Sequence, residues 1–201
     1  MSKRKTTILV IEDDRAFQTD PFVIEVKEKF ESIIFKENTN DALLFVKDNL
    51  NTRFIILLDL AFPNNQMQGE QFLSKLRELS RLIPVIIWSG NDRNPTDYRK
   101  MINDLTFAFV QKGATSEVII ETLWKADDYL NSQIDTAVES WLEKHSEEEK
   151  NKPFLTTADG NSYSMNDLLK EIRMQTSFGQ SILLDINKLT LDLLFRNKEK
   201  L

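Results

Sequence analysis

Five short runs of apolar and β-favouring residues recur along the first half of the chain, and almost every position within them is apolar. They are residues 8–11, 33–35, 54–60, 84–88 and 107–110. A strand that is apolar at consecutive positions is buried on both faces, which is typical of a parallel sheet covered by helices. The sequence therefore predicts five parallel strands.

Segments with helical signals separate these runs. We expect five helices, which begin near residues 21, 39, 69, 94 and 115. Asp20 followed by Pro21 is typical of a helix start, because Asp caps the first turn and Pro fits its first position. For the second helix, which runs to about Asn49, Thr39 or Asn40 is the expected cap. Strict alternation of strand and helix predicts a doubly wound α/β fold, with a site at the carboxyl ends of the strands.

Polar residues occur at those strand ends. Glu12 and Asp13 follow the first run, Asp59 ends the third, Ser89 follows the fourth and Lys112 follows the fifth. Carboxylates that share one sheet edge repel one another unless a counter-ion is present. A divalent cation with oxygen ligands, such as Mg²⁺, would relieve this repulsion, and a lysine and a hydroxyl nearby suit a phosphoryl group. Each residue taken alone has an ordinary structural explanation, so the prediction depends on their combination.

This ordered set resembles the response-regulator receiver domain over residues 1 to about 130, and the resemblance implies a flavodoxin-like fold. The motifs are VIEDD at 10–14, LLDLAFP at 57–63, PVIIWSG at 84–90 and the lysine at 112. The resemblance implies that Asp59 is the phospho-acceptor and that Asp13 binds Mg²⁺ directly, whereas Glu12 acts through water. It also implies that the backbone carbonyl of Ala61 is a metal ligand.

Further roles follow from the same resemblance. Lys112 would pair with the phosphoryl group, while Ser89 and Phe109 would be the switch residues. Two departures from the family pattern concern loops. The acceptor loop, residues 63–69, is about two residues longer, and Gly113 stands where the family has a proline after the lysine. The Lys112–Gly113 bond is expected to be trans, because a cis bond without proline costs about 2.5–4 kcal/mol.

The resemblance implies a signalling protein of two-component systems, with no activity beyond self-phosphorylation and slow autodephosphorylation. A sensor histidine kinase or a phosphotransfer protein would supply the phosphoryl group, and a downstream protein or self-association would carry the output. Two alternatives remain open. One is a receiver-like scaffold that works without phosphorylation, and the other is a DNA-binding regulator that uses the C-terminal helices.

Composition bears on these alternatives. Residues 151–201 contain 7 basic and 6 acidic side chains, and the whole chain has a net charge of −6, so nucleic-acid binding has little electrostatic support. No apolar segment approaches the roughly 18 residues of a membrane span, and the first apolar run is too short for a signal peptide. Cysteine is absent. We therefore expect a cytoplasmic protein that does not insert into membranes.

The second half of the sequence indicates three parts: the receiver at 1–130, a helical extension and linker at 131–152, and a small, mostly helical module at 153–201. A heptad-like row of apolar residues predicts that the fifth helix continues past the receiver, with its seam either packed internally or paired in a dimer. The row comprises Ile119, Leu123, Ala126, Leu130, Ile134, Ala137 and Trp141. In the module, the turn at 158–161 predicts a short hairpin. Ser164 is the expected cap of a helix to about Met174, and Gly179 is expected to separate it from a final helix.

Overall fold

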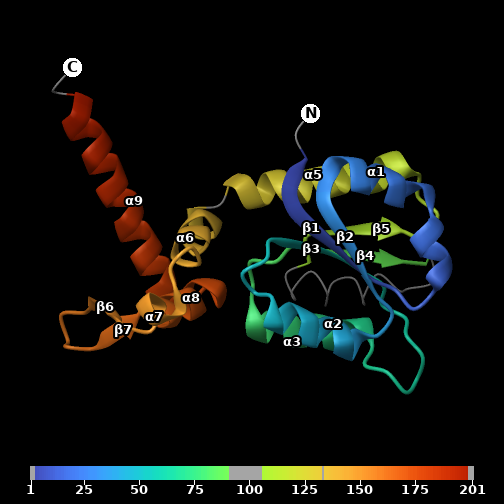
Figure 1. The fold of residues 1–201 in the computed structure, drawn as a ribbon, viewed down its shortest axis with the longest axis horizontal. Helices are drawn as coiled ribbons and strands as arrows, with labels where there is room; N and C mark the ends of the chain where they lie inside the picture. The colour runs from blue at the N-terminus through green and yellow to red at the C-terminus, as the bar shows by residue number, and fades with distance from the viewer. Residues whose placement is uncertain (1–2, 91–105, 133, 199–201) are drawn as a thin grey trace. The chain divides into compact units, whose positions relative to one another are not determined.

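The computed structural model describes residues 3–90, 106–132 and 134–198, which fall into two compact units, Met1–Leu130 and Asn131–Leu201 (Figure 1). The helix expected near residue 94 lies outside the described residues. Among the described helices, none is both long enough and apolar enough to cross a membrane.

The first unit is built on a five-stranded sheet in which every pairing is parallel. Its strands are β1 (Arg4–Ile11), β2 (Phe30–Lys36), β3 (Phe54–Leu58), β4 (Val85–Ser89) and β5 (Ala108–Gln111), in the order β2-β1-β3-β4-β5. The register places Ile11 beside Leu58 and Ser89 beside Gln111. The strand ends therefore meet at one edge of the sheet, and the predicted doubly wound fold is confirmed.

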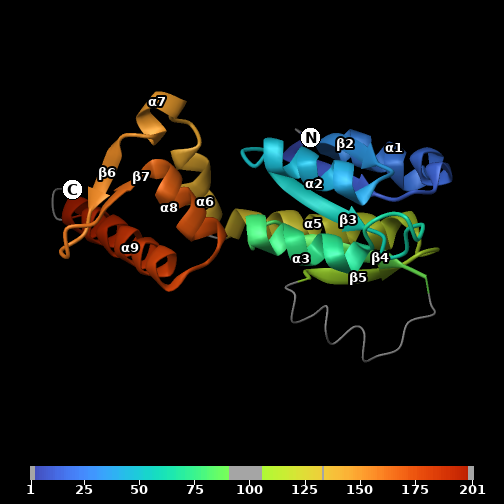
Figure 2. The same ribbon diagram turned by 90° about the horizontal axis from the view of Figure 1, so that it is seen from below.

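Helices cover both faces of this sheet, as the two views in Figures 1 and 2 show. The helices are α1 (Pro21–Lys29) and α5 (Ser116–Ser132) on one face, and α2 (Thr39–Asp48) and α3 (Gly69–Leu79) on the other. The cap of α2 is Asn38, whose side chain accepts hydrogen bonds from Asn40 N and Asp41 N, so the expectation of Thr39 or Asn40 is wrong. Thr39 instead points inward, and its Oγ1 donates to the carbonyl of Met67 at 2.6 Å.

Two apolar cores result from the alternation of side chains along the strands. In β1, Ile8 and Val10 pack toward α1 and α5, whereas Leu9 and Ile11 pack toward α2 and α3; all four are fully buried. Because both faces are covered, the strands are apolar at consecutive positions, as a parallel sheet requires. The continuous apolar runs of the sequence thus reflect two cores that share one sheet.

An ionic cluster holds α5 at the sheet edge opposite to the strands' carboxyl ends. Asp127, only 2% exposed, accepts from Arg4 at 2.6 Å and from Thr6 Oγ1 at 2.5 Å. A guanidinium nitrogen of Arg53 lies 3.5 Å from the same carboxylate. A buried carboxylate needs such partners, because burial without them is costly. These contacts connect α5 to the beginning of the sheet.

The second unit combines a hairpin with helices. Its elements are α6 (Ile134–Leu142), α7 (Glu147–Lys150), β6 (Pro153–Thr156), β7 (Ser162–Ser164), α8 (Met165–Arg173) and α9 (Ser177–Lys198). The hairpin around residues 158–161 and the cap at Ser164 are both as predicted. Residues 131–152, expected as a helical extension and linker, contribute α6 and α7 to this unit.

Two predictions for the second half are wrong. Gly179 lies inside α9 and does not precede it. A Cβ there would lie 2.5 Å from the Glu171 carbonyl oxygen, so α9 packs closely against the backbone of α8 at this residue. The heptad-like row does not form one surface either. Its members in α5 are buried in the core of the first unit, whereas Trp141 in α6 is 49% exposed and its neighbour Leu142 is buried.

Charged side chains join the helices of the second unit. Arg173 in α8 lies 2.6 Å from Glu139 of α6 and 2.6 Å from Glu143, the residue after α6, and Lys150 lies 3.0 Å from Glu143. Burial raises the pKa of Glu139 above its usual value. Burial also acts to raise the pKa of Glu143, but its bonds to Lys150 and Arg173 outweigh this effect and lower it. This small unit therefore depends on buried ion pairs as well as on apolar packing.

Candidate phosphoryl and metal site

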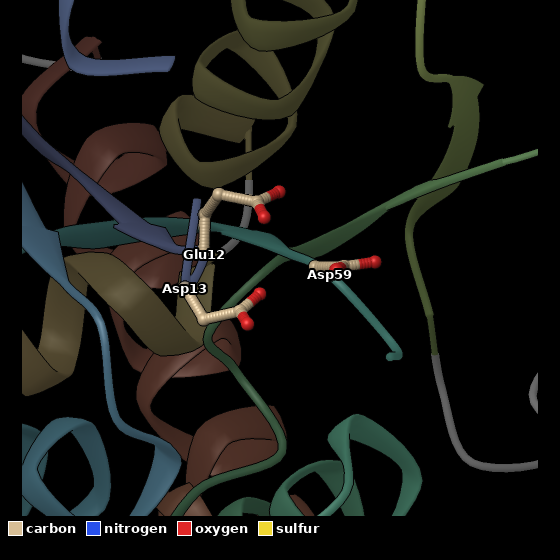
Figure 3. Close-up of side chains that lie close together, drawn as sticks. All are labelled: Glu12, Asp13 and Asp59. Atoms are coloured by element: carbon tan, nitrogen blue, oxygen red, sulfur yellow. The ribbon is translucent and has the colours of Figure 1, made fainter. Parts of the chain in front are cut away.

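Three acidic side chains come together where β1 and β3 end. Glu12 and Asp13 follow the last residue of β1, and Asp59 follows β3. The parallel pairing extends one step past the strands, because Asp59 N donates to the carbonyl of Ile11 at 3.0 Å. Figure 3 shows the three carboxylates directed into the same region beyond the strand ends.

The geometry of this cluster suits a metal ion. One carboxylate oxygen from each of the three residues lies within 4.8 Å of the others. Glu12 and Asp59 are each 3% exposed, whereas Asp13 is exposed to solvent. A hard divalent cation binds carboxylate oxygens and retains several waters, so an open acidic cluster of this kind fits Mg²⁺.

Lys112 bridges the two buried acids. Its Nζ lies 2.9 Å from Asp59 Oδ2 and 2.8 Å from Glu12 Oε2. Burial alone would lower the pKa of Lys112, but the bonds to the two carboxylates outweigh it, and the net effect is a raised pKa. Lys112 is therefore charged at neutral pH and partly neutralises the cluster.

The two buried acids are not equally satisfied. Asp59 Oδ1 accepts from Leu60 N at 2.7 Å, in addition to the contact of Oδ2 with Lys112. Glu12 Oε1 accepts a hydrogen bond from Asp14 N at 3.2 Å. Oε2 of Glu12 forms an ion pair with Lys112 Nζ at 2.8 Å, but this buried oxygen accepts no hydrogen bond that meets the geometric criteria from the part of the chain that the structure describes. Burial is the main cause that raises the pKa of Glu12. A metal-bound water would supply the hydrogen bond that this oxygen lacks.

The other residues expected at the site lie at the same edge of the sheet. Ser89 is the last residue of β4, and its carbonyl accepts from Lys112 N at 2.9 Å, while its Oγ is 3.4 Å from the carbonyl of Gly90. Phe109 pairs with Ile87 in the sheet and is 36% exposed. Ala61 is exposed in the loop after Asp59. Of these expected residues, Lys112 contacts the carboxylate cluster with its side chain.

The acceptor loop is held by contacts that sequence reasoning did not foresee. The side chain of Gln68 accepts from Phe62 N at 3.2 Å and donates to the Phe62 carbonyl at 2.9 Å, which closes the long loop onto itself. Gly69 then packs against the backbone of Asp59, where a Cβ would lie 2.3 Å from the carbonyl oxygen. The only sequence signal for this contact was a glycine in the acceptor loop.

Gly113 also has a structural requirement. Its φ is +95°, a conformation that residues with a Cβ rarely adopt, in the turn that connects β5 to α5. No cis peptide bond occurs among the described residues, so the Lys112–Gly113 bond is trans as predicted. The turn after Lys112 therefore requires a glycine at residue 113, the position at which the receiver pattern has a proline.

Solved structures of receiver domains share this fold. A signal receiver domain of a LuxO repressor protein from Vibrio parahaemolyticus is 21% identical, with a TM-score of 0.56, and the match covers 71% of this chain and 99% of that one. A receiver-domain protein from Clostridium thermocellum is 18% identical (TM-score 0.55; 63% and 97% covered). A DNA-binding response regulator of the LuxR family from Staphylococcus aureus is 25% identical (TM-score 0.52; 61% and 98% covered).

Sequence comparison found no relative: neither a protein-family model nor a curated protein sequence matches the chain. The structural matches nonetheless show that the first unit has the fold of response-regulator receiver domains. The carboxylate cluster lies at the edge of the sheet where the sequence motifs predicted it.

Replacing Gly69 with alanine tests the close contact beneath Asp59. The added methyl group has no space beside the Asp59 carbonyl, so we expect Gly69→Ala to lower the free energy of unfolding by about 1–3 kcal/mol, as overpacking usually does. Urea denaturation measures the change. Gly90→Ala is the matched control, because nothing lies within 4 Å of its Cβ position. Equal stabilities of the two variants would contradict the close packing.

Proposed function

We propose that the chain is a two-component response regulator whose Asp59 accepts a phosphoryl group in the presence of Mg²⁺. The observation that supports this proposal most directly is the ammonium of Lys112 within 3 Å of both Asp59 and Glu12, next to the exposed carboxylate of Asp13. Such a site offers a nucleophile, a fixed cation and a place for a metal within one cluster. The donor would be the phosphohistidine of a sensor histidine kinase or of a phosphotransfer protein.

In this reaction a carboxylate oxygen of Asp59 attacks phosphorus, the bond between phosphorus and the donor imidazole nitrogen breaks, and neutral histidine leaves after protonation. Bound Mg²⁺, held by Asp13 and Asp59, by the Ala61 carbonyl and by Glu12 through water, would neutralise phosphoryl oxygens. Lys112 exchanges its contact with Asp59 for one with the phosphoryl group. Ser89 and Phe109 would then change position as the switch.

We propose that the protein catalyses no reaction other than its self-phosphorylation and slow autodephosphorylation. A receiver-like scaffold that works without phosphorylation is the second candidate. The ion pair between Lys112 and Asp59 favours the phospho-accepting response regulator over the scaffold. A scaffold does not need two buried carboxylates and an ammonium at one edge of the sheet.

The acceptor assignment is tested by phosphorylation with acetyl phosphate and Mg²⁺. We expect the wild-type chain to gain the mass of one phosphoryl group and Asp59→Asn to gain none, because an amide is not a nucleophile for phosphorus. Intact-protein mass spectrometry measures the product. Labelling of Asp59→Asn at the wild-type level would refute the acceptor assignment, and an unlabelled wild type would favour the scaffold.

The metal site is tested by Asp13→Ala. Removing the exposed ligand should weaken Mg²⁺ binding by on the order of tenfold or more and should abolish phosphorylation. Mg²⁺ titration followed by amide chemical shifts measures the affinity without any phosphoryl donor. Asp14→Asn is the control, because the Asp14 side chain caps the following turn through Ala16 N and does not join the cluster. Equal affinities of Asp13→Ala and wild type would exclude this site.

For the output we propose protein–protein contact through α9, with a second copy of the chain as the partner. The C-terminal half of α9 exposes Leu189 (62%) and Leu193 (61%), and these continue the row begun by Ile182 and Ile186 at spacings of 4, 3 and 4. This spacing is that of a coiled-coil seam, in which identical helices interlock. A large exposed apolar row on a helix is typical of an interaction surface.

The charges beside this row favour a parallel pair. In the heptad of this row, Ile186 and Leu193 occupy the positions called a. Asp185 and Asp192 directly precede them and lie on one flank of the row, whereas Thr190 lies on the other flank. In an antiparallel pair, the aspartates of the two chains would face one another and repel. In a parallel pair each acidic flank faces the neutral flank of its partner.

Solution mass tests the output surface. We expect the full chain to form a dimer and Leu189→Lys/Leu193→Lys to be monomeric by light scattering, because a charge in the seam prevents burial. Leu184→Lys/Leu191→Lys is the matched control, since these exposed leucines lie on the opposite side of the helix and should leave the dimer intact. A monomeric wild type would refute self-association. Phosphorylation-dependent, salt-sensitive binding of duplex DNA would instead support the DNA-binding alternative.

A further inference from the structure

A short 3-10 helix, η1 (Arg15–Thr19), places an aromatic side chain against the site. The segment was not expected from the sequence, and its conformation is set locally. Asp14 caps its first turn through Ala16 N at 2.9 Å, and Asp20 N donates to the Phe17 carbonyl at 3.3 Å. Phe17 is therefore held by hydrogen bonds on both sides.

The ring of Phe17 contacts two residues of the sheet edge. It lies 4.5 Å, centroid to centroid, from Trp88 in an edge-to-face arrangement, and Trp88 is fully buried next to Ser89. The Nζ of Lys112 lies over the same ring, 5.1 Å from its centroid. One aromatic ring thus packs against the core of β4 and also against the cation of the site.

The ammonium of Lys112 consequently has three neighbours. Glu12 and Asp59 occupy two of its sides at 2.8 and 2.9 Å, and the Phe17 ring occupies a third. A cation over an aromatic face within about 6 Å is attracted by the negative face of the ring, and this attraction is stronger where water is largely excluded. The Lys112 side chain is only 25% exposed, so this condition is met.

We propose that Phe17 is a positioning residue for Lys112: its ring holds the ammonium at the site when the contact with Asp59 is exchanged for one with a phosphoryl group. The inference depends on the proposed function and extends it to a residue outside the acidic cluster. Phe17 acts through Lys112 and does not touch the reacting atoms. Because the same ring packs on Trp88, it also couples the lysine to the strand that carries Ser89.

Phe22 provides a matched control within the same aromatic group. Its ring also packs edge-to-face on Trp88, at 5.1 Å, but among the described contacts it makes none with Lys112. Phe17→Leu and Phe22→Leu therefore both remove an aromatic contact with Trp88, and only the first removes the ring beneath the ammonium. Phe17→Tyr keeps an aromatic face and should restore the wild-type behaviour.

The first measurement needs no ligand. A ring near Lys112 shifts the NMR signals of its ε-methylene protons. We expect this shift to be lost in Phe17→Leu, retained in Phe22→Leu and restored in Phe17→Tyr. If Phe17→Leu leaves the Lys112 signals unchanged, the proposal is overturned. Thermal unfolding of each variant establishes that it is folded. If Phe17→Leu does not fold, the wild-type chain decides, because unshifted Lys112 ε-methylene signals in it would overturn the proposal.

The second measurement uses beryllium fluoride, a mimic of the acyl phosphate, at saturating Mg²⁺. We expect Phe17→Leu to bind it about threefold to tenfold more weakly than wild type, and Phe22→Leu and Phe17→Tyr to bind it normally. Trp88 fluorescence, in a background with Trp124 and Trp141 replaced by Phe, reports binding. Failure of the wild type to bind would refute the proposed function. Equal binding by wild type and Phe17→Leu would refute only the role of Phe17.

Discussion

The contact of the Lys112 ammonium with Glu12 and Asp59 is the interaction on which the site depends. Two carboxylates that are each 3% exposed cannot both remain charged beside one another without a cation. Lys112 supplies that cation from the end of β5, at 2.8 and 2.9 Å. Asp13 lies exposed beside them, so the cluster can be reached from solvent on that side. The same contact therefore permits the burial of the two acids while Asp13 keeps the cluster accessible.

The sheet provides the geometry that this interaction requires. Because the strands are parallel, the ends of β1, β3 and β5 lie at one edge of the sheet. The hydrogen bond from Lys112 N to the Ser89 carbonyl holds the backbone of Lys112 beside the end of β4. At the opposite edge, Asp127 holds α5 to Arg4 and Thr6. Charged clusters thus lie at both ends of an apolar sheet: in one, side chains of the same chain pair with Asp127, and in the other, Asp13 is exposed to solvent.

The second unit is organised by different forces. Its apolar core is small, and Arg173 and Lys150 connect its helices through buried ion pairs with Glu139 and Glu143. Breaking one side of a buried pair is strongly unfavourable, whereas the pair itself contributes little net stability. Such a unit holds its helices in a defined arrangement. It also leaves leucines in the C-terminal half of α9 exposed, and these form the surface that we propose for the output.

Several features could be predicted from the sequence alone. The continuous apolar runs determined the parallel sheet, because a strand covered on both faces has no polar side. The polar residues that follow these runs had to meet at one edge, since parallel strands end together, and so Glu12, Asp13, Asp59 and Lys112 could be placed near one another. The turn at residues 158–161 and the cap at Ser164 were local signals with local outcomes.

Tertiary structure decided what depends on contacts between distant residues. Whether the row from Ile119 to Trp141 forms one seam could not be read from its spacing, because burial of its first part in one core and exposure of its last part depend on which helices pack beside it. In the sequence, Gly179 indicated a boundary between two helices. In the fold it lies inside α9, where α9 packs against α8. The ring of Phe17 over Lys112 joins residues that are far apart in the chain, and no periodic pattern encodes such a contact. Periodicity determines which face of an element is apolar, but only the packed chain determines what that face meets.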